Sequence, residues 1–145
     1  MNPITEELGY LLKEVQQDLR KRMDRALMEL NLTTPQYSVL SQLHEFPGLS
    51  SADLARKSFV TPQTMNLIVQ KLEARELLGR ALSTNHGKIL NTEVTSEGKD
   101  LLNKANAIVL QVQAEIFNPI SEDETIMLTD ILRKLRKASA LQHLD

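Results

Sequence analysis

The chain has 145 residues, of which 41% are hydrophobic, 25% charged and 3% aromatic, and it contains no cysteine. This length and composition predict one globular domain with an aliphatic core, and the lack of cysteine excludes disulfides, thiolate metal sites and thiol redox chemistry. The sequence has no apolar run long enough to cross a bilayer, so we expect a cytoplasmic protein with no membrane partner.

The formal net charge of −2 is unevenly distributed along the chain. Residues 50–90 hold six Lys and Arg residues against three Asp and Glu residues, which gives this segment a charge of +3 and leaves −5 on the rest. A basic middle is what a local phosphate footprint requires. A difference of this size can equally arise by chance.

The N-terminal third predicts two helices. Apolar residues recur every three or four positions over residues 4–30, which is typical of one long helix. Thr34-Pro35 has the pattern of a capping residue followed by proline at the first helical position. A second helix is therefore expected from Pro35 to Phe46, where Pro47-Gly48 ends it.

The next segment predicts two short helices joined by a tight turn, which is a helix-turn-helix. Ser50 and Asp53 have the spacing of a capping box at the start of the first helix. Thr61 can cap the second, and Pro62 follows at the position where its missing N–H costs nothing. In a helix-turn-helix, the second helix enters the DNA major groove.

That second helix, VTPQTMNLIVQKLE at residues 60–73, has two distinct faces at about 100° per residue. The apolar face is expected to meet a core and comprises Met65, Ile68, Val69 and Leu72. The opposite face comprises Gln63, Thr64, Asn66, Leu67, Gln70 and Lys71. Amides donate and accept together, which suits base edges in a DNA groove. The alternative is an ordinary solvated surface. The sequence of this helix, taken alone, favours that alternative over DNA contact.

The remaining chain predicts a hairpin and two long helices. Asn85-His86-Gly87 reads as a turn between short extended runs at Arg80–Thr84 and Lys88–Val94, as in a winged helix. Helical periodicity returns over residues 95–118, and Ser121 with Glu124 forms a capping box before the last helix. Long apolar stripes at both ends of a small domain favour a homodimer over an intramolecular bundle.

Taken in this order, the elements resemble the MarR family of bacterial winged-helix transcription regulators over nearly the whole chain. Residues 49–80, LSSADLARKSFVTPQTMNLIVQKLEARELLGR, resemble the family's helix-turn-helix. Residues 94–102, VTSEGKDLL, resemble the Leu-Thr-x-x-Gly opening of its dimerisation helix. The resemblance implies a mainly α fold with a small β-hairpin wing in one domain over 1–145. Its dimerisation helices would lie at 1–33 and 96–145, around a DNA-binding lobe at 34–95.

The resemblance also implies a function. The expected protein is a sequence-specific repressor that binds double-stranded DNA as a homodimer on a palindromic operator, released by a small aromatic or phenolic effector. Tyr10, Tyr37 and His44 are candidates for the effector pocket, with core packing as the alternative for each. The predicted DNA-binding residues are Ser51, Arg56, Thr61, Pro62, Gln63, Thr64, Asn66, Leu67, Gln70, Lys71, Arg80, His86 and Lys88.

The sequence departs from the family pattern at three places. The wing tip, which usually carries Asp-x-Arg, is His86-Gly87-Lys88 here, so Lys88 keeps the positive charge without the planar fork of arginine. Glu76 stands where the family often has the Gly of its Gly-Leu motif. Leu67 occupies an exposed position where a polar or basic residue is common. These changes predict weaker wing contacts rather than a different fold.

Two other classes of protein are alternatives to a DNA-binding regulator. For an enzyme, the three histidines (His44, His86 and His143) have no metal-ligand spacing, and no Gly-rich loop follows a strand. We therefore expect no catalytic residue, metal or cofactor. The second alternative is a winged-helix protein-interaction module without strong DNA binding, which the acidic flanks and the altered wing tip favour slightly.

Overall fold

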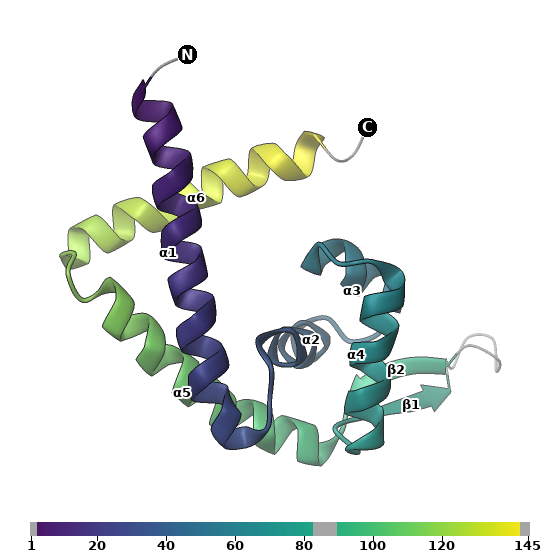
Figure 1. Cartoon of the computed structure of the whole chain (residues 1–145). Helices are drawn as coiled ribbons and strands as arrows, with labels where there is room; N and C mark the ends of the chain where they lie inside the picture. Colours follow the sequence, from purple (N-terminus) through teal and green to yellow (C-terminus); the bar gives the residue numbers. More distant parts are fainter. Residues whose placement is uncertain (1–2, 83–89, 143–145) are drawn as a thin grey trace. The chain divides into compact units, whose positions relative to one another are not determined.

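The computed structural model describes residues 3–82 and 90–142. A helical chain with one antiparallel hairpin is observed, as the sequence predicts (Figure 1). The elements in chain order are α1 (Pro3–Leu27), the 3-10 turn η1 (Met28–Leu30), α2 (Thr34–Glu45), α3 (Ser51–Ser58), α4 (Pro62–Ala74), β1 (Leu78–Leu82), β2 (Leu90–Val94), α5 (Ser96–Phe117) and α6 (Glu122–Gln142).

The chain forms two compact units, Met1–Val112 and Gln113–Asp145. The second contains the end of α5 and all of α6. Its capping box is confirmed: Ser121 Oγ accepts from the Glu124 N–H at 3.1 Å, and the Ser121 N–H donates to Glu124 Oε1 at 3.0 Å. These two hydrogen bonds lower the pKa of Glu124. No helix within the described ranges is both long and apolar enough to span a membrane.

In the first unit, α2, α3 and α4 cluster with the β1–β2 hairpin, and α1 extends away from them for most of its length (Figure 1). The core is aliphatic, as the composition predicts. It draws on α2, α3, α4, both strands and α5, together with the end of α1. Its largest fully buried side chains are Leu27, Val39, Leu40, Leu43, Leu54, Met65, Leu72 and Leu102.

The hairpin differs in detail from the sequence prediction. β1 begins at Leu78 rather than Arg80, because Leu78 pairs with Val94 and both side chains are buried. The pairing continues to Leu82 opposite Leu90, which keeps the register that the predicted turn requires. The expected tip residues, His86 and Lys88, lie outside the described residues.

The start of α2 corrects one capping assignment. The N-cap is Thr33 and not Thr34: Thr33 Oγ1 accepts from the Gln36 N–H at 3.2 Å, and the Gln36 side chain accepts from the Thr33 N–H at 3.1 Å. Both threonines satisfy the capping rule, but only Thr33 has Gln36 three residues later to complete the box. Pro35 then falls within the first turn, where proline is tolerated.

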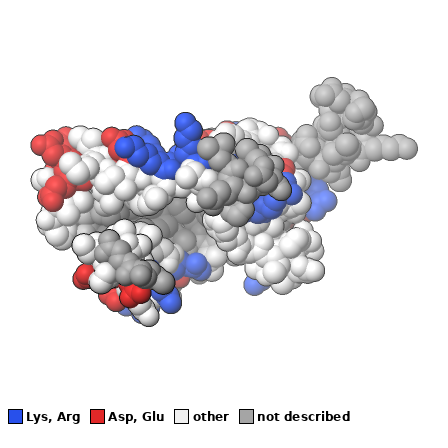
Figure 2. Space-filling model, turned by 90° about the horizontal axis from the view of Figure 1, so that it is seen from above, with Lys and Arg blue, Asp and Glu red and all other residues white. Residues whose placement is uncertain are grey.

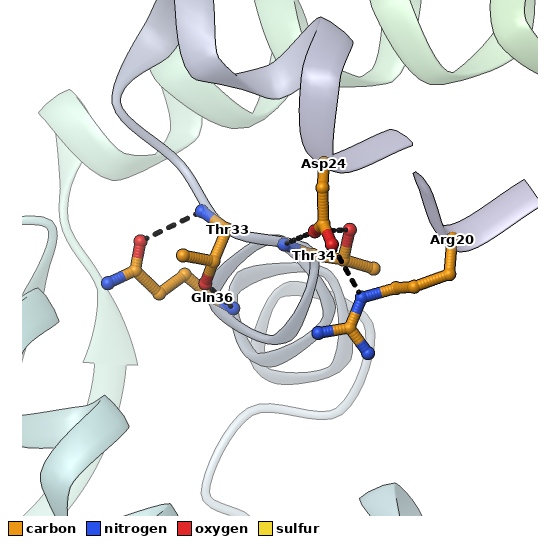
Figure 3. A network of polar contacts seen from close by, with 5 residues as sticks. All are labelled: Arg20, Asp24, Thr33, Thr34 and Gln36. Carbon is orange, nitrogen blue, oxygen red and sulfur yellow. Dashed lines mark hydrogen bonds and ion pairs between the residues drawn. The ribbon is translucent and has the colours of Figure 1, made fainter. Parts of the chain in front are cut away.

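Thr34 is thereby free to tie α2 to α1 (Figure 3). Asp24 Oδ1 accepts from the Thr34 backbone N–H at 3.1 Å and from the Thr34 hydroxyl. Its Oδ2 accepts from Arg20 Nε at 3.0 Å. Burial raises the pKa of Asp24, but the hydrogen bonds from Thr34 and the Arg20 guanidinium outweigh that effect and hold it below its ordinary value.

The beginning of α5 packs tightly against Leu77, the residue before β1. Thr95 Oγ1 donates to the Glu76 carbonyl at 2.6 Å and accepts from the Gly98 N–H at 3.0 Å. A Cβ on Gly98 would lie 2.2 Å from the Leu77 carbonyl oxygen. Only glycine fits this crossing, which gives a physical reason for the Thr-x-x-Gly pattern at the start of α5.

We predict that Gly98→Ala lowers the free energy of unfolding by about 1–3 kcal/mol, because the backbone at Leu77 must shift to admit a methyl group. Gly79→Ala is the matched control, since a Cβ there meets Thr95 at an ordinary 3.5 Å. The measurement is urea unfolding at fixed protein concentration. Equal stability of the two variants would contradict the close packing.

We also predict that Asp24 makes stability depend on pH. Because the folded-state pKa is depressed, its contribution is present above the unfolded-state pKa and disappears as the pH falls through the folded-state pKa. Asp24→Asn should cost about 1 kcal/mol at pH 7, and the cost should vanish at low pH.

Asp18→Asn is the control, because Asp18 pairs with Arg22 on the surface of α1 at the same spacing but forms no hydrogen bond or ion pair with α2 among the described residues. It should cost less than about 0.5 kcal/mol. Chemical unfolding between pH 2 and pH 7 measures both. A pH-independent cost for Asp24→Asn would refute the assignment.

Candidate nucleic-acid interface

The helix-turn-helix is built by local hydrogen bonds. Ser50 Oγ accepts from the Asp53 N–H at 3.1 Å, and the Ser50 N–H donates to Asp53 Oδ2 at 3.3 Å, which confirms the capping box of α3. The hydrogen bonds from Ser50 are the main cause of the lowered pKa of Asp53. α3 ends at Phe59, which has φ of 55° and closes the turn by donating its N–H to carbonyls of the last helical turn.

The first turn of α4 confirms the predicted cap. Thr61 Oγ1 accepts from the Thr64 N–H at 3.1 Å, and Pro62 is the first helical residue. The Thr61 hydroxyl also donates to Thr64 Oγ1 at 3.0 Å. The N-terminus of α4 is therefore fixed by its own side chains, and the following residues are held in a defined register.

The two faces of α4 are separated as predicted. Met65, Val69 and Leu72 are buried, and Ile68 is partly buried against the same core. All six residues of the opposite face are exposed: Gln63, Thr64, Asn66, Leu67, Gln70 and Lys71. Leu67 is 59% exposed. The structure thus presents a polar surface along the helix that contains one apolar side chain, Leu67.

The basic side chains around this surface are mostly paired. Arg56 forms an ion pair with Asp53, and Arg80 lies 3.2 Å from Glu73. Both arginines are exposed, so these pairs contribute little and can be exchanged for a phosphate. Lys71 is exposed and has no ion pair among the described residues. Ser51, another predicted contact, is half-buried in the first turn of α3.

Two residues directly after α4 have structural roles that were not predicted from the sequence. Arg75 donates to the carbonyl oxygens of Asn31, at 2.6 Å, and Leu30, at 3.2 Å. These partners lie about 45 positions away, so no local pattern could reveal them. Glu76 has φ of 60°, a conformation that favours glycine. The sequence signal for this backbone conformation was that Glu76 stands where the family often has glycine.

The three candidate pocket residues have different surroundings. His44 lines a cavity of about 170 Å³ together with Leu43, Pro47, Glu93, Val94 and Lys99. Tyr10 is 70% exposed and lines a separate hollow on α1 that shares none of these residues. The Tyr37 hydroxyl donates to Asn106 Oδ1 at 2.6 Å, and burial raises the pKa of Tyr37. Within the described ranges, no group of three His, Asp or Glu side chains could hold a metal ion.

A capped helix-turn-helix followed by an antiparallel hairpin and flanked by long helices defines the winged-helix class. The family model described as "MarR family" matches residues 30–89. The HTH-type transcriptional repressor Rv2887 of Mycobacterium tuberculosis is 38% identical over 128 residues, covering 88% of this chain and 92% of that protein. The chain belongs to the MarR family of transcription regulators.

Two solved structures of the M. tuberculosis protein are similar to this chain. The structure in complex with salicylic acid has a TM-score of 0.78 at 38% identity, covering 88% of this chain and 95% of that one. The structure in complex with DNA has a TM-score of 0.74 at 35% identity, covering 88% and 96%. Each supports the winged-helix assignment over most of the length of both chains.

We predict that Glu76→Gly raises the free energy of unfolding by about 0.5–1 kcal/mol, because glycine adopts positive φ without the Cβ penalty. Glu76→Ala is the matched control: it removes the same charge but keeps the Cβ. Thermal unfolding at fixed protein concentration compares them. If alanine stabilised as much as glycine, charge and not backbone conformation would explain the gain.

Proposed function

We propose that this protein is a transcriptional repressor that binds a palindromic DNA operator as a homodimer, with α4 in the major groove. The observation that carries the proposal is the exposed polar face of α4, held outward by burial of the opposite face. A recognition helix needs this division, because one side must pack and the other must reach bases. The similar M. tuberculosis protein is named a repressor and has been solved with DNA.

The side chains of α4 divide by chemistry. Gln63 and Thr64 lie in the first turn, the part of a recognition helix that reaches base edges. Asn66 and Gln70 follow on the same face and offer paired donors and acceptors to adenine. Lys71 is positioned for phosphate.

Leu67 is assigned to a thymine methyl group, which an aliphatic side chain contacts better than an amide does. The alternative is an exposed apolar residue that makes no DNA contact. The other assigned contacts support α4. Ser51 and Arg56 on α3, Thr61 and Pro62 at the turn, and Arg80 on β1 approach the sugar-phosphate backbone. His86 and Lys88 approach it from the wing.

The homodimer is supported by apolar surface on the long helices. On α1, Ile4, Leu8, Leu11 and Val15 are exposed, with Ile4 at 72%. On α6, the exposed apolar residues are Ile126, Met127, Leu128, Ile131, Leu132 and Leu135. Figure 2 shows that residues other than Lys, Arg, Asp and Glu also make up much of one face of the chain. Monomeric proteins rarely expose large apolar patches, and we assign the dimer interface to the helices at 1–33 and 96–145.

A small aromatic acid is the proposed effector. The M. tuberculosis protein was solved with salicylic acid, and a ligand of this class needs a cation for its carboxylate and an apolar wall for its ring. The cavity at His44 supplies Lys99 for the first and Leu43 and Val94 for the second. Tyr10 and Tyr37 remain candidates from the sequence. The cytoplasmic location also remains a prediction.

The test is selection of bound sites from a random duplex library, followed by salt titration on the selected site. We expect a palindrome and an affinity that falls steeply with salt, since each phosphate contact releases a counterion. Gln70→Ala should lose about 1–3 kcal/mol of discrimination at one base per half-site. Gln17→Ala, an exposed glutamine on α1, is the control.

Failure to enrich any sequence would overturn the proposal. A weak, salt-insensitive interaction with DNA would instead favour a protein-interaction module.

A further inference from the structure

We propose that Arg75 is a positioning residue that fixes the direction of α4 relative to α1 and thereby sets the spacing between DNA half-sites. The inference rests on the proposed function, because spacing has meaning only for a dimer on DNA. Arg75 is not among the residues of the exposed face of α4, and its guanidinium binds backbone carbonyls at the end of α1. Its effect would pass through the two helices that it joins.

The contact joins the ends of two helices that are far apart in sequence. Arg75 is the C-cap residue of α4, and its own N–H donates to the Lys71 and Glu73 carbonyls. Its guanidinium reaches the end of α1, where one nitrogen donates to the Asn31 carbonyl at 2.6 Å and the other to the Leu30 carbonyl at 3.2 Å. A single side chain therefore connects the last turn of the recognition helix to the turn that ends α1.

Electrostatics favour a cation at this place. The carbonyls at a helix C-terminus lack intrahelical donors and carry partial negative charge. Here α1 closes through η1 and Asn31, which has φ of 53°, and its terminal carbonyls lie near the C-terminus of α4. The Arg75 guanidinium satisfies the first set of carbonyls and lies at the negative end of the second helix.

The guanidinium also adds direction that apolar packing lacks. Met65, Val69 and Leu72 hold α4 against the core, but hydrophobic contact is non-directional and admits small rotations. Arginine presents nitrogens in a rigid planar fork, so two hydrogen bonds to two successive carbonyls fix an orientation. The two guanidinium hydrogen bonds set the orientation of α4, and its buried apolar face sets how closely it packs against the core.

A small tilt of α4 about its C-terminus displaces its N-terminal turn by a large distance. α4 has 13 residues, so it is about 20 Å long at 1.5 Å per residue. A tilt of about 10° about its C-terminus would move the first turn by roughly 3.5 Å, which is close to the 3.4 Å rise of one base pair. Loss of the two guanidinium hydrogen bonds should therefore widen the range of accepted half-site spacings by about one base pair. The sequence selected in each half-site should not change.

The experiment uses the full chain and compares wild type, Arg75→Met, Arg75→Lys and Arg25→Met. Arg25→Met is the control, because Arg25 is an exposed arginine in the last turn of α1 with no ion pair among the described residues. Each protein selects sites from a random duplex library. Its affinity is then measured for the wild-type site and for duplexes with one base pair inserted or removed at the centre.

For wild type and Arg25→Met, we expect the altered spacings to bind at least about tenfold more weakly. For Arg75→Met, the penalty should fall to about threefold or less, with the same half-site sequence selected. Arg75→Lys should lie between them, because a single ammonium keeps the charge but loses the fork. Spacing preference is the deciding readout, since a purely structural role would lower the unfolding midpoint and leave that preference sharp.

An unchanged spacing penalty in a folded Arg75→Met protein would overturn the inference. If Arg75→Met fails to fold, Arg75→Lys carries the test. Failure of both to fold would assign Arg75 to folding and also overturn it. If wild type selects no palindrome, the proposed function fails instead, and the two failures are thereby distinguished.

Discussion

Burial of one face of α4 is the interaction on which the rest of this structure depends. Met65, Val69 and Leu72 are within 3% of complete burial, and at about 25 cal/mol per Å² such side chains supply several kcal/mol of stabilisation together. Because the helix repeats every 3.6 residues, packing these positions leaves the amides of the opposite face in solvent. The exposed polar face of α4 is a geometric consequence of the core and needs no separate scaffold.

The segment after α4 connects this helix to its neighbours and so helps to fix its orientation. Arg75 holds the end of α1, Glu76 turns the chain at positive φ, and the Leu77 carbonyl accepts from the Thr95 N–H at 3.1 Å. Gly98 permits α5 to approach the same carbonyl. Three consecutive residues, 75–77, thus link α4 to the end of α1 and to the start of α5.

The sequence predicted features that depend on neighbours within a few positions. The caps at Ser50, Thr61 and Ser121 are local and were correct, as were the two faces of α4 and the mainly α fold. Thr33 and Thr34 show the limit of this reasoning, because two adjacent residues met the same rule and a third, Gln36, decided between them.

Features that join distant parts of the chain gave no such signal. The Arg75 contacts and the Thr34–Asp24 link depend on how the helices pack. The need for glycine at position 98 arises only because α5 approaches the Leu77 carbonyl. The division into dimerisation helices and a DNA-binding lobe remains a prediction, and so do the individual DNA contacts.

The central claim is that the exposed face of α4 reads DNA bases, and the side-chain amides of that face can report on it directly. In ¹⁵N-labelled protein, the NH₂ resonances of Gln63, Asn66 and Gln70 should shift when the selected palindromic duplex is added, while that of Gln17 on α1 should not. The same α4 resonances should move much less with a duplex of scrambled sequence. Tight binding that leaves the three α4 amides unshifted would contradict the account.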